Sequence, residues 1–125
     1  MISFRYIVKD VESSVNFYTE ALGFQVKQKF PAMAIVYKDE LTLWLAGPKA
    51  SASIPMPDGR VPEPGGWNRF VLQVPNLESY VSQLKSRGVR FRNEIVTGPG
   101  GSQILAEDPS GNVIELFQPA EHLPR

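Results

Sequence analysis

The sequence predicts an α+β fold built from two βαβββ modules. Two stretches of the chain repeat the same order: a strand-like run, a polar residue suited to cap a helix, an apolar stripe at helical spacing, and a closing glycine. Three more strand-like runs follow each glycine, separated by turn-forming residues. We therefore divide the 125 residues into a first module (1–46), a connector (47–66) and a second module with a C-terminal tail (67–125), which together form one domain.

The first module begins with residues 2–9, ISFRYIVK, which are β-branched or aromatic in the main and contain no glycine or proline. Asp10 is suited to cap the helix that follows, and Gly23 ends it. The apolar positions of this helix recur at helical spacing: Val11, Val15, Tyr18 and Leu22. Three strands are then predicted, at residues 24–30, 33–38 and 41–46.

The second module repeats this order. Residues 69–74, RFVLQV, form the predicted first strand, Asn76 caps the helix, and Gly88 ends it. The apolar stripe consists of Leu77, Val81 and Leu84. The three strands predicted after it span residues 89–96, 102–107 and 112–118.

The connector is rich in proline, glycine and serine and shows no periodicity. A segment of this length without regular structure is uncommon inside a compact domain. Residues 47–66 are therefore either a surface connector or a functional lid.

Composition narrows the classes of function. Lysine and arginine balance aspartate and glutamate at 13 each, which argues against nucleic-acid or membrane partners. The absence of cysteine excludes disulfides, thiolate metal sites and a cysteine nucleophile. No stretch is apolar enough to span a bilayer, so we expect a cytoplasmic protein. The single histidine, His122, lies in the terminal tail, where we expect it to be exposed and inert.

Three motifs resemble the vicinal-oxygen-chelate superfamily, the group of glyoxalase I, bleomycin-resistance proteins and extradiol dioxygenases. The segment IVKDVESSVNFYTEALGF is similar to the family's first strand-to-helix segment, and VPNLESYVSQLKSRGVRF to the matching segment of the second half. The segment EDPSGNVIELFQP is close to the family's last hairpin. The resemblance implies that the two modules pair into a curved sheet trough with the helices outside.

The resemblance also implies where a metal would bind. In metal-dependent members, one side chain from the first and one from the last strand of each module hold a divalent ion. The corresponding residues here are Ser3, Trp44, Arg69 and Glu115. Tryptophan has no basic lone pair, and arginine stays protonated and offers only donors. We therefore predict no metal ligands and no cofactor.

Alternation along each strand then predicts which side chains face the trough. The predicted ligand-binding residues are Ser3, Arg5, Thr42, Trp44, Arg69, Gln73, Glu115 and Phe117. We expect Arg69 to take the metal's place as the counter-charge of Glu115, through a bidentate pair. The alternatives are a fixed ion bridge without a ligand role for this pair, core packing for Trp44, and an exposed strand end for Arg5. Trp67 is a candidate to close the mouth of the cavity.

Three functions remain open. The first is a metal-free protein that binds a small, anionic or oxygen-rich aromatic molecule, similar to the drug-sequestering branch of the family. The second is a metal-dependent lyase, isomerase or dioxygenase, which would need misplaced ligands such as Glu94 or Glu107 beside Glu115. The third is metal-free catalysis, with Glu115 as general base and Arg69 stabilising an oxyanion. The family also implies a homodimer, and the segment 47–66 would permit an exchange of modules between two chains.

Overall fold

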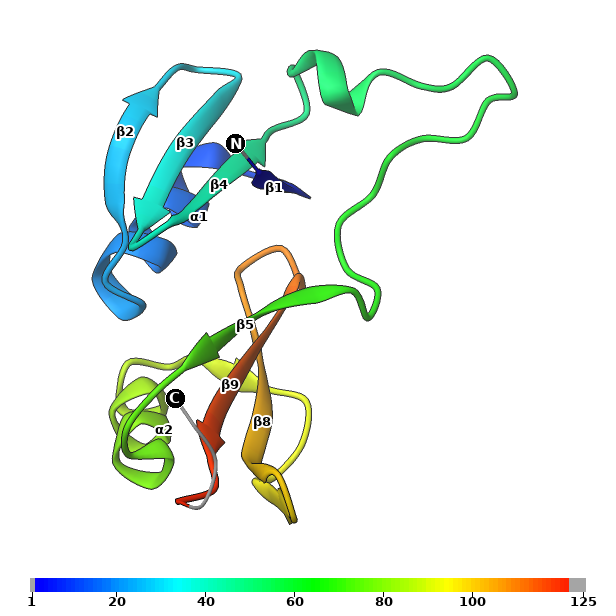
Figure 1. Cartoon of the computed structure of the whole chain (residues 1–125). Helices are drawn as coiled ribbons and strands as arrows, with labels where there is room; N and C mark the ends of the chain where they lie inside the picture. The colour runs from blue at the N-terminus through cyan, green and yellow to red at the C-terminus, as the bar shows by residue number, and fades with distance from the viewer. Residues whose placement is uncertain (1, 122–125) are drawn as a thin grey trace. The chain divides into compact units, whose positions relative to one another are not determined.

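The structure is a computed structural model that describes residues 2–121 (Figure 1). His122 lies outside these residues. The chain divides into two compact units. One comprises the chain up to Gly66 together with Pro109–Asn112, and the other comprises Trp67–Asp108 and the chain from Val113 onward. The α+β prediction is confirmed, because each unit pairs a mixed sheet with a short helix.

The sheet of the first unit has four strands in the order β1-β4-β3-β2. Strand β1 lies parallel to β4, and the remaining neighbours are antiparallel. The strands span Ser3–Ile7 (β1), Gln25–Lys29 (β2), Met33–Lys38 (β3) and Leu41–Ala46 (β4). All four predicted strands of this module are therefore present.

The helical segment of the first unit changes type along its length. Helix α1 (Val11–Asn16) begins at Asp10, whose Oδ2 accepts a hydrogen bond from the Ser13 N–H at 2.8 Å. A π-helical turn, η1 (Phe17–Ala21), replaces the α-helix that we predicted up to residue 22. In this turn the Thr19 hydroxyl donates to the Val15 carbonyl at 2.8 Å, a local bond of the kind that competes with the backbone ladder.

The second unit repeats the arrangement around a five-stranded sheet. Its order is β5-β9-β8-β6, and β7 also pairs with β8. The strands span Arg69–Gln73 (β5), Arg90–Phe91 (β6), Val96–Gly98 (β7), Gly101–Glu107 (β8) and Val113–Pro119 (β9). Helix α2 (Leu77–Ser86) begins at Asn76, whose Oδ1 accepts from the Ser79 N–H at 3.2 Å.

The strand predicted at residues 89–96 is wrong as one element, because the structure divides it into β6 and β7. Between them the side chain of Asn93 accepts a hydrogen bond from the Leu105 N–H at 3.0 Å. A side-chain oxygen thus takes a donor of β8 that a continuous strand would bond through its backbone.

The connector contains a short 3₁₀ turn, η2 (Ser51–Ser53). A second turn follows, in which the Met56 N–H donates to the Arg60 carbonyl at 2.8 Å. Figure 1 shows this part of the chain extending away from the sheet of the first unit. The connector therefore holds local structure that its composition did not predict.

The turn Pro109–Asn112 belongs to the first unit through three hydrogen bonds. The Asn112 amide donates to the Ile7 carbonyl and accepts from the Gly65 N–H, both at 2.8 Å. The Ser110 hydroxyl accepts from the Lys9 N–H at 2.8 Å. Asn112 and Ser110 are buried, so this turn is an internal part of the unit rather than a surface loop.

Each sheet has one apolar and one mixed face. The predicted helix stripes are buried, and so are the strand residues that alternate toward them, among them Tyr6, Leu43, Leu45, Phe70, Ile104, Ile114 and Leu116. The opposite faces carry the predicted ligand-binding side chains. Among the described residues, no helix is long and apolar enough to cross a membrane.

Candidate ligand-binding site

The mixed face of the second unit is organised by strands β5, β9 and β8. Strand β5 lies parallel to β9, with Arg69 opposite Val113 and Val71 opposite Glu115. Arg69 and Glu115 therefore share a face and lie diagonally, which a long arginine side chain can span.

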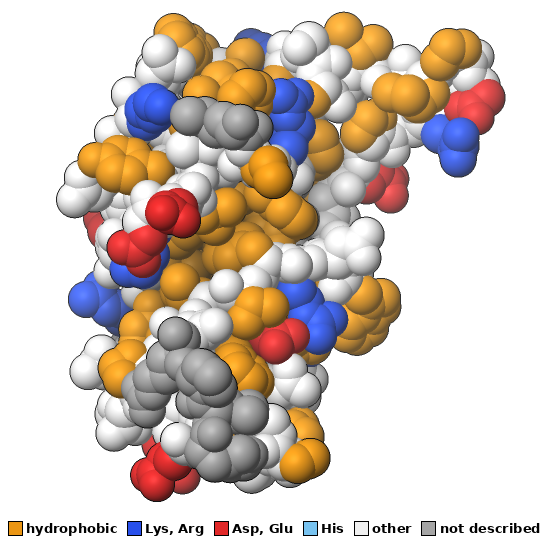
Figure 2. Space-filling model, viewed as in Figure 1, with side chains coloured by type: hydrophobic (Ala, Val, Ile, Leu, Met, Phe, Trp, Pro, Cys, Tyr) orange, Lys and Arg blue, Asp and Glu red, His pale blue; other side chains and the backbone are white. Residues whose placement is uncertain are grey.

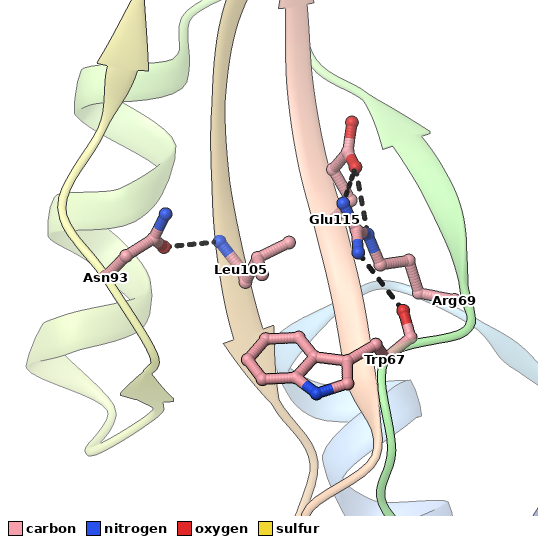
Figure 3. Close-up of polar contacts among 5 residues, drawn as sticks. All are labelled: Trp67, Arg69, Asn93, Leu105 and Glu115. Atoms are coloured by element: carbon pink, nitrogen blue, oxygen red, sulfur yellow. Dashed lines mark hydrogen bonds and ion pairs between the residues drawn. The ribbon is translucent and has the colours of Figure 1, made fainter.

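The expected ion pair between Arg69 and Glu115 is present (Figure 3). The Arg69 Nε and Nη2 atoms donate to Glu115 Oε1 at 3.0 and 2.8 Å. The prediction of a bidentate pair is wrong in its detail, because both donors meet one oxygen instead of one donor meeting each oxygen. The diagonal register of the two strands brings the guanidinium to Oε1 and leaves Oε2 for another donor.

That donor is Gln103, which our sequence analysis missed. In the orientation that satisfies its neighbours, the Gln103 amide nitrogen donates to Glu115 Oε2 at 2.8 Å and lies 3.3 Å from Oε1. Gln103 lies on β8, where Leu105 is the residue opposite Glu115. The alternation of residues 102–107 was the signal that could have identified it, since Gln103, Leu105 and Glu107 share the face of Glu115.

Glu115 is thus a compensated, largely buried carboxylate, with a side chain only 12% exposed. Both of its oxygens accept hydrogen bonds, one from a guanidinium and one from an amide. A general base needs a lone pair directed at the substrate's proton, and these donors already engage most of the acceptor sites of the carboxylate. This arrangement favours a fixed charge pair over proton transfer by Glu115.

The pair extends to Trp67 and then to a second ion pair. The Arg69 Nη1 atom donates to the Trp67 carbonyl at 3.1 Å, and the Arg92 guanidinium lies 4.5 Å from the centroid of the Trp67 ring. The Arg92 Nε atom in turn donates to Glu107 Oε2 at 2.8 Å. We refer to these five residues, Glu115, Arg69, Trp67, Arg92 and Glu107, as the Trp67 network.

The mixed face of the first unit holds a smaller group. Ser3 lies opposite Thr42 and Arg5 opposite Trp44 in the β1–β4 ladder. The hydroxyls of Ser3 and Thr42 are 2.5 Å apart, and the Arg5 guanidinium lies 4.9 Å from the centroid of the Trp44 ring. Ser3, Arg5 and Trp44 line a hollow of about 150 Å³ together with Phe4. Trp44 is half-buried rather than part of the core, and Arg5 lies over it.

The two remaining predicted residues, Gln73 at the end of β5 and Phe117 in β9, lie opposite each other. Gln73 is exposed and Phe117 is half-buried. They therefore offer a polar and an aromatic contact on the same face as Glu115.

The residues at the family's metal positions do not fit a divalent cation. Ser3 is bonded to Thr42, Trp44 has no basic lone pair, and Arg69 places a positive charge against Glu115. In the part of the chain that the structure describes, no three His, Cys, Asp or Glu side chains are grouped so as to hold a metal. Glu107 is bonded to Arg92, and Glu94 is exposed.

The chain is similar to known proteins along almost its whole length. It is 24% identical to a lactoylglutathione lyase of Pseudomonas putida, with 90% of this chain and 80% of that protein aligned. A superfamily member from Sphaerobacter thermophilus superposes with a TM-score of 0.75 at 27% identity, covering 93% of this chain and 94% of that one. The antibiotic-binding protein TnmS3 from Streptomyces superposes with a TM-score of 0.69 at 26% identity, covering 96% and 97%.

The family model of the Glyoxalase/Bleomycin resistance protein/Dioxygenase superfamily matches residues 2–116. This range includes the first βαβββ repeat, the second repeat as far as Leu116 in β9, and the Arg69–Glu115 pair. The chain therefore belongs to the Glyoxalase/Bleomycin resistance protein/Dioxygenase superfamily.

Proposed function

We propose that this protein binds a small, anionic or oxygen-rich aromatic molecule on the mixed face of a sheet, without the metal of its relatives. The observation that supports this proposal is the environment of Glu115. Its carboxylate occupies the family's metal-ligand position, yet it accepts donors from Arg69 and Gln103. The guanidinium here replaces the ion as the source of positive charge, and the amide adds a neutral donor.

The chemistry of the ligand follows from the side chains on these faces. Arg5 contributes a guanidinium and Trp44 a flat apolar ring in the first unit. In the second unit, contacts with described residues engage three of the five N–H donors of Arg69, which leaves two for a ligand oxygen. Cationic donors beside aromatic rings suit an oxygen anion on an aromatic framework, and they disfavour a strongly cationic drug.

The decisive experiment is calorimetric titration of the purified protein with Zn²⁺, Ni²⁺ and Mn²⁺. We expect no saturable heat, because Arg69 repels a cation from Glu115. The variant Arg69→Ala is the matched comparison, since it removes this charge and leaves the carboxylate in place. Stoichiometric binding of any of these ions to the unaltered protein would refute the metal-free proposal.

The second candidate is a metal-dependent lyase, isomerase or dioxygenase of the same superfamily. The similarity to a lactoylglutathione lyase favours it. An assay for turnover of lactoylglutathione, with each metal added in turn, separates the two candidates. Metal-dependent turnover that is lost in Glu115→Gln would establish the enzyme.

We further propose that the protein is a cytoplasmic homodimer whose ligands are small molecules rather than nucleic acids or membranes. The balance of 13 basic and 13 acidic residues supports the choice of ligand class. Size-exclusion chromatography with light scattering tests the dimer, and a monomer mass at micromolar concentration would reject it.

A further inference from the structure

The exposed ring of Trp67 is the least expected feature of the second unit. Trp67 is 66% exposed, although a tryptophan normally buries most of its large apolar surface. Because the ring is open to solvent beside Arg69 and Glu115, it is accessible to a ligand that contacts this pair.

The Trp67 network holds this ring from two directions. On the backbone side, Arg69 donates to the Trp67 carbonyl while two of its other nitrogens bond to Glu115. On the side-chain side, Arg92 lies 4.5 Å from the ring centroid. The Arg92 side chain is only 19% exposed and bonds to Glu107, so its guanidinium is not a loose surface charge.

This arrangement pre-organises an apolar surface at the edge of the polar face. Stacking a guanidinium on an indole restricts both groups before any ligand arrives. A ligand that stacks on the ring then loses less conformational entropy than it would with a mobile tryptophan. Figure 3 shows the Trp67 ring projecting from the same side of the sheet as the Arg69–Glu115 pair.

We propose that Trp67 is a stacking platform for a planar aromatic carboxylate, whose ring lies on the indole and whose oxygens meet Arg69. This proposal rests on the proposed function and deepens it, because it names the ligand class and assigns its ring to a residue outside the family's metal positions. The carboxylate is placed at Arg69 because contacts with described residues leave two of its N–H donors for a ligand. Arg92 is a positioning residue, which acts through the indole.

The test follows the indole N–H signals of ¹⁵N-labelled protein during titration with 2-naphthoate. The chain has two tryptophans, and the signal that is lost in Trp67→Phe identifies Trp67. We expect a saturable shift of the Trp67 signal with 2-naphthoate. We expect no shift with the saturated analogue, decahydronaphthalene-2-carboxylate, which has the same charge but no flat aromatic face.

Variants separate stacking from simple burial. Trp67→Ala should weaken 2-naphthoate binding about ten-fold, whereas Trp67→Phe should retain most of the affinity because it keeps a flat ring. Arg92→Met should weaken binding less than Trp67→Ala does, with an unchanged near-ultraviolet circular dichroism spectrum as the check on folding. Phe30→Ala is the matched control, since Phe30 is an aromatic residue of the first unit that is 51% exposed, and it should leave the affinity unchanged.

The possible failures are distinguishable. If 2-naphthoate binds and moves only the Trp44 signal, the platform is wrong while the proposed function stands. Equal binding of the saturated acid would also overturn the platform. If neither acid binds at millimolar concentration, both the platform and the proposed ligand class are wrong.

Discussion

Glu115 shows how one side chain depends on its neighbours. A carboxylate removed from water in the middle of a strand needs donors to replace its hydration. Arg69 supplies charge and two hydrogen bonds, and Gln103 supplies an uncharged donor to the other oxygen. The pair is partly shielded, with the two side chains 29% and 12% exposed, so we expect it to contribute more than a surface ion pair.

Removing the arginine tests this compensation. Arg69→Ala leaves the carboxylate of Glu115 without its counter-charge and should lower the free energy of unfolding by about 1–3 kcal/mol. Urea denaturation at neutral pH measures the change. The double variant Arg69→Ala/Glu115→Gln should recover part of the loss, because no uncompensated charge remains. An Arg69→Ala protein that gained affinity for zinc or nickel without losing stability would contradict the idea of a counter-charge.

At the scale of elements, the N-termini of the two helices are also stabilised by side-chain acceptors. Asp10 and Asn76 each accept a hydrogen bond from a serine N–H three residues later. This contact satisfies one of the backbone donors that a helix leaves open at its first turn. The two modules thus begin their helices through equivalent bonds, although one cap is charged and the other is neutral.

The charged cap should make part of the stability depend on pH. The hydrogen bond from the Ser13 backbone, followed by that from its side chain, lowers the pKa of Asp10 below its ordinary value of 3.8. The contribution of the charged Asp10 cap to the stability of the fold is therefore complete above this value. It is lost as the pH falls through the lower pKa of Asp10 in the folded state. Asp10→Asn keeps the cap without its titration. The difference in urea midpoint between the two proteins should change below pH 4 and stay constant from pH 5 to 7.

Two consecutive glycines, Gly100 in the turn between β7 and β8 and Gly101 at the start of β8, have different requirements. Gly101 has φ of +145°, and a Cβ there would lie 2.2 Å from the carbonyl oxygen of Gln118. The neighbouring Gly100 has open space at the same position. Strand β9 therefore passes so close to Gly101 that only a residue without a side chain fits.

These two glycines form a matched pair of variants. Gly101→Ala should destabilise the fold by about 1–3 kcal/mol through backbone strain and the close approach of β9. Gly100→Ala should change the stability by no more than about 0.5 kcal/mol. Thermal unfolding of both proteins provides the comparison, and equal melting temperatures would disprove the requirement at Gly101.

At the scale of the whole molecule, the turn Pro109–Asn112 connects segments that lie far apart in sequence. The Asn112 side chain bonds to the end of β1 through Ile7 and to the end of the connector through Gly65. The residue is 2% exposed, so water does not replace these partners if the side chain is removed. One amide thereby joins three separate parts of the chain.

Asn112→Ala should consequently lower the free energy of unfolding by about 1–3 kcal/mol, because the partly buried Ile7 carbonyl and Gly65 N–H both lose their partner. Guanidinium denaturation measures this loss. Asn16→Ala, at an exposed helical asparagine, is the control and should be nearly neutral. A neutral Asn112→Ala would show that water or a shifted backbone satisfies both groups.

Local chemistry made most of the fold predictable. The caps at Asp10 and Asn76, the helix stripes and seven of the eight predicted strands depend on short-range preferences and periodicity, and the structure contains them at nearly the expected residues. The β6–β7 division and the π-helical turn were not predictable in this way. Side-chain bonds from Asn93 and Thr19 to backbone groups accompany them, and such bonds compete with the regular ladder.

Periodicity along the chain was enough to predict the repeated modules and the faces of their strands, because alternation and helical spacing are properties of neighbouring residues. The pairing of Arg69 with Glu115 was expected from the resemblance to the family and not from periodicity. The detail of the site came from the tertiary structure: both arginine donors meet one oxygen, Gln103 completes the carboxylate, and Arg92 lies against Trp67. These contacts join side chains through strand register and turn geometry. Both arise from packing between segments that are distant in the chain.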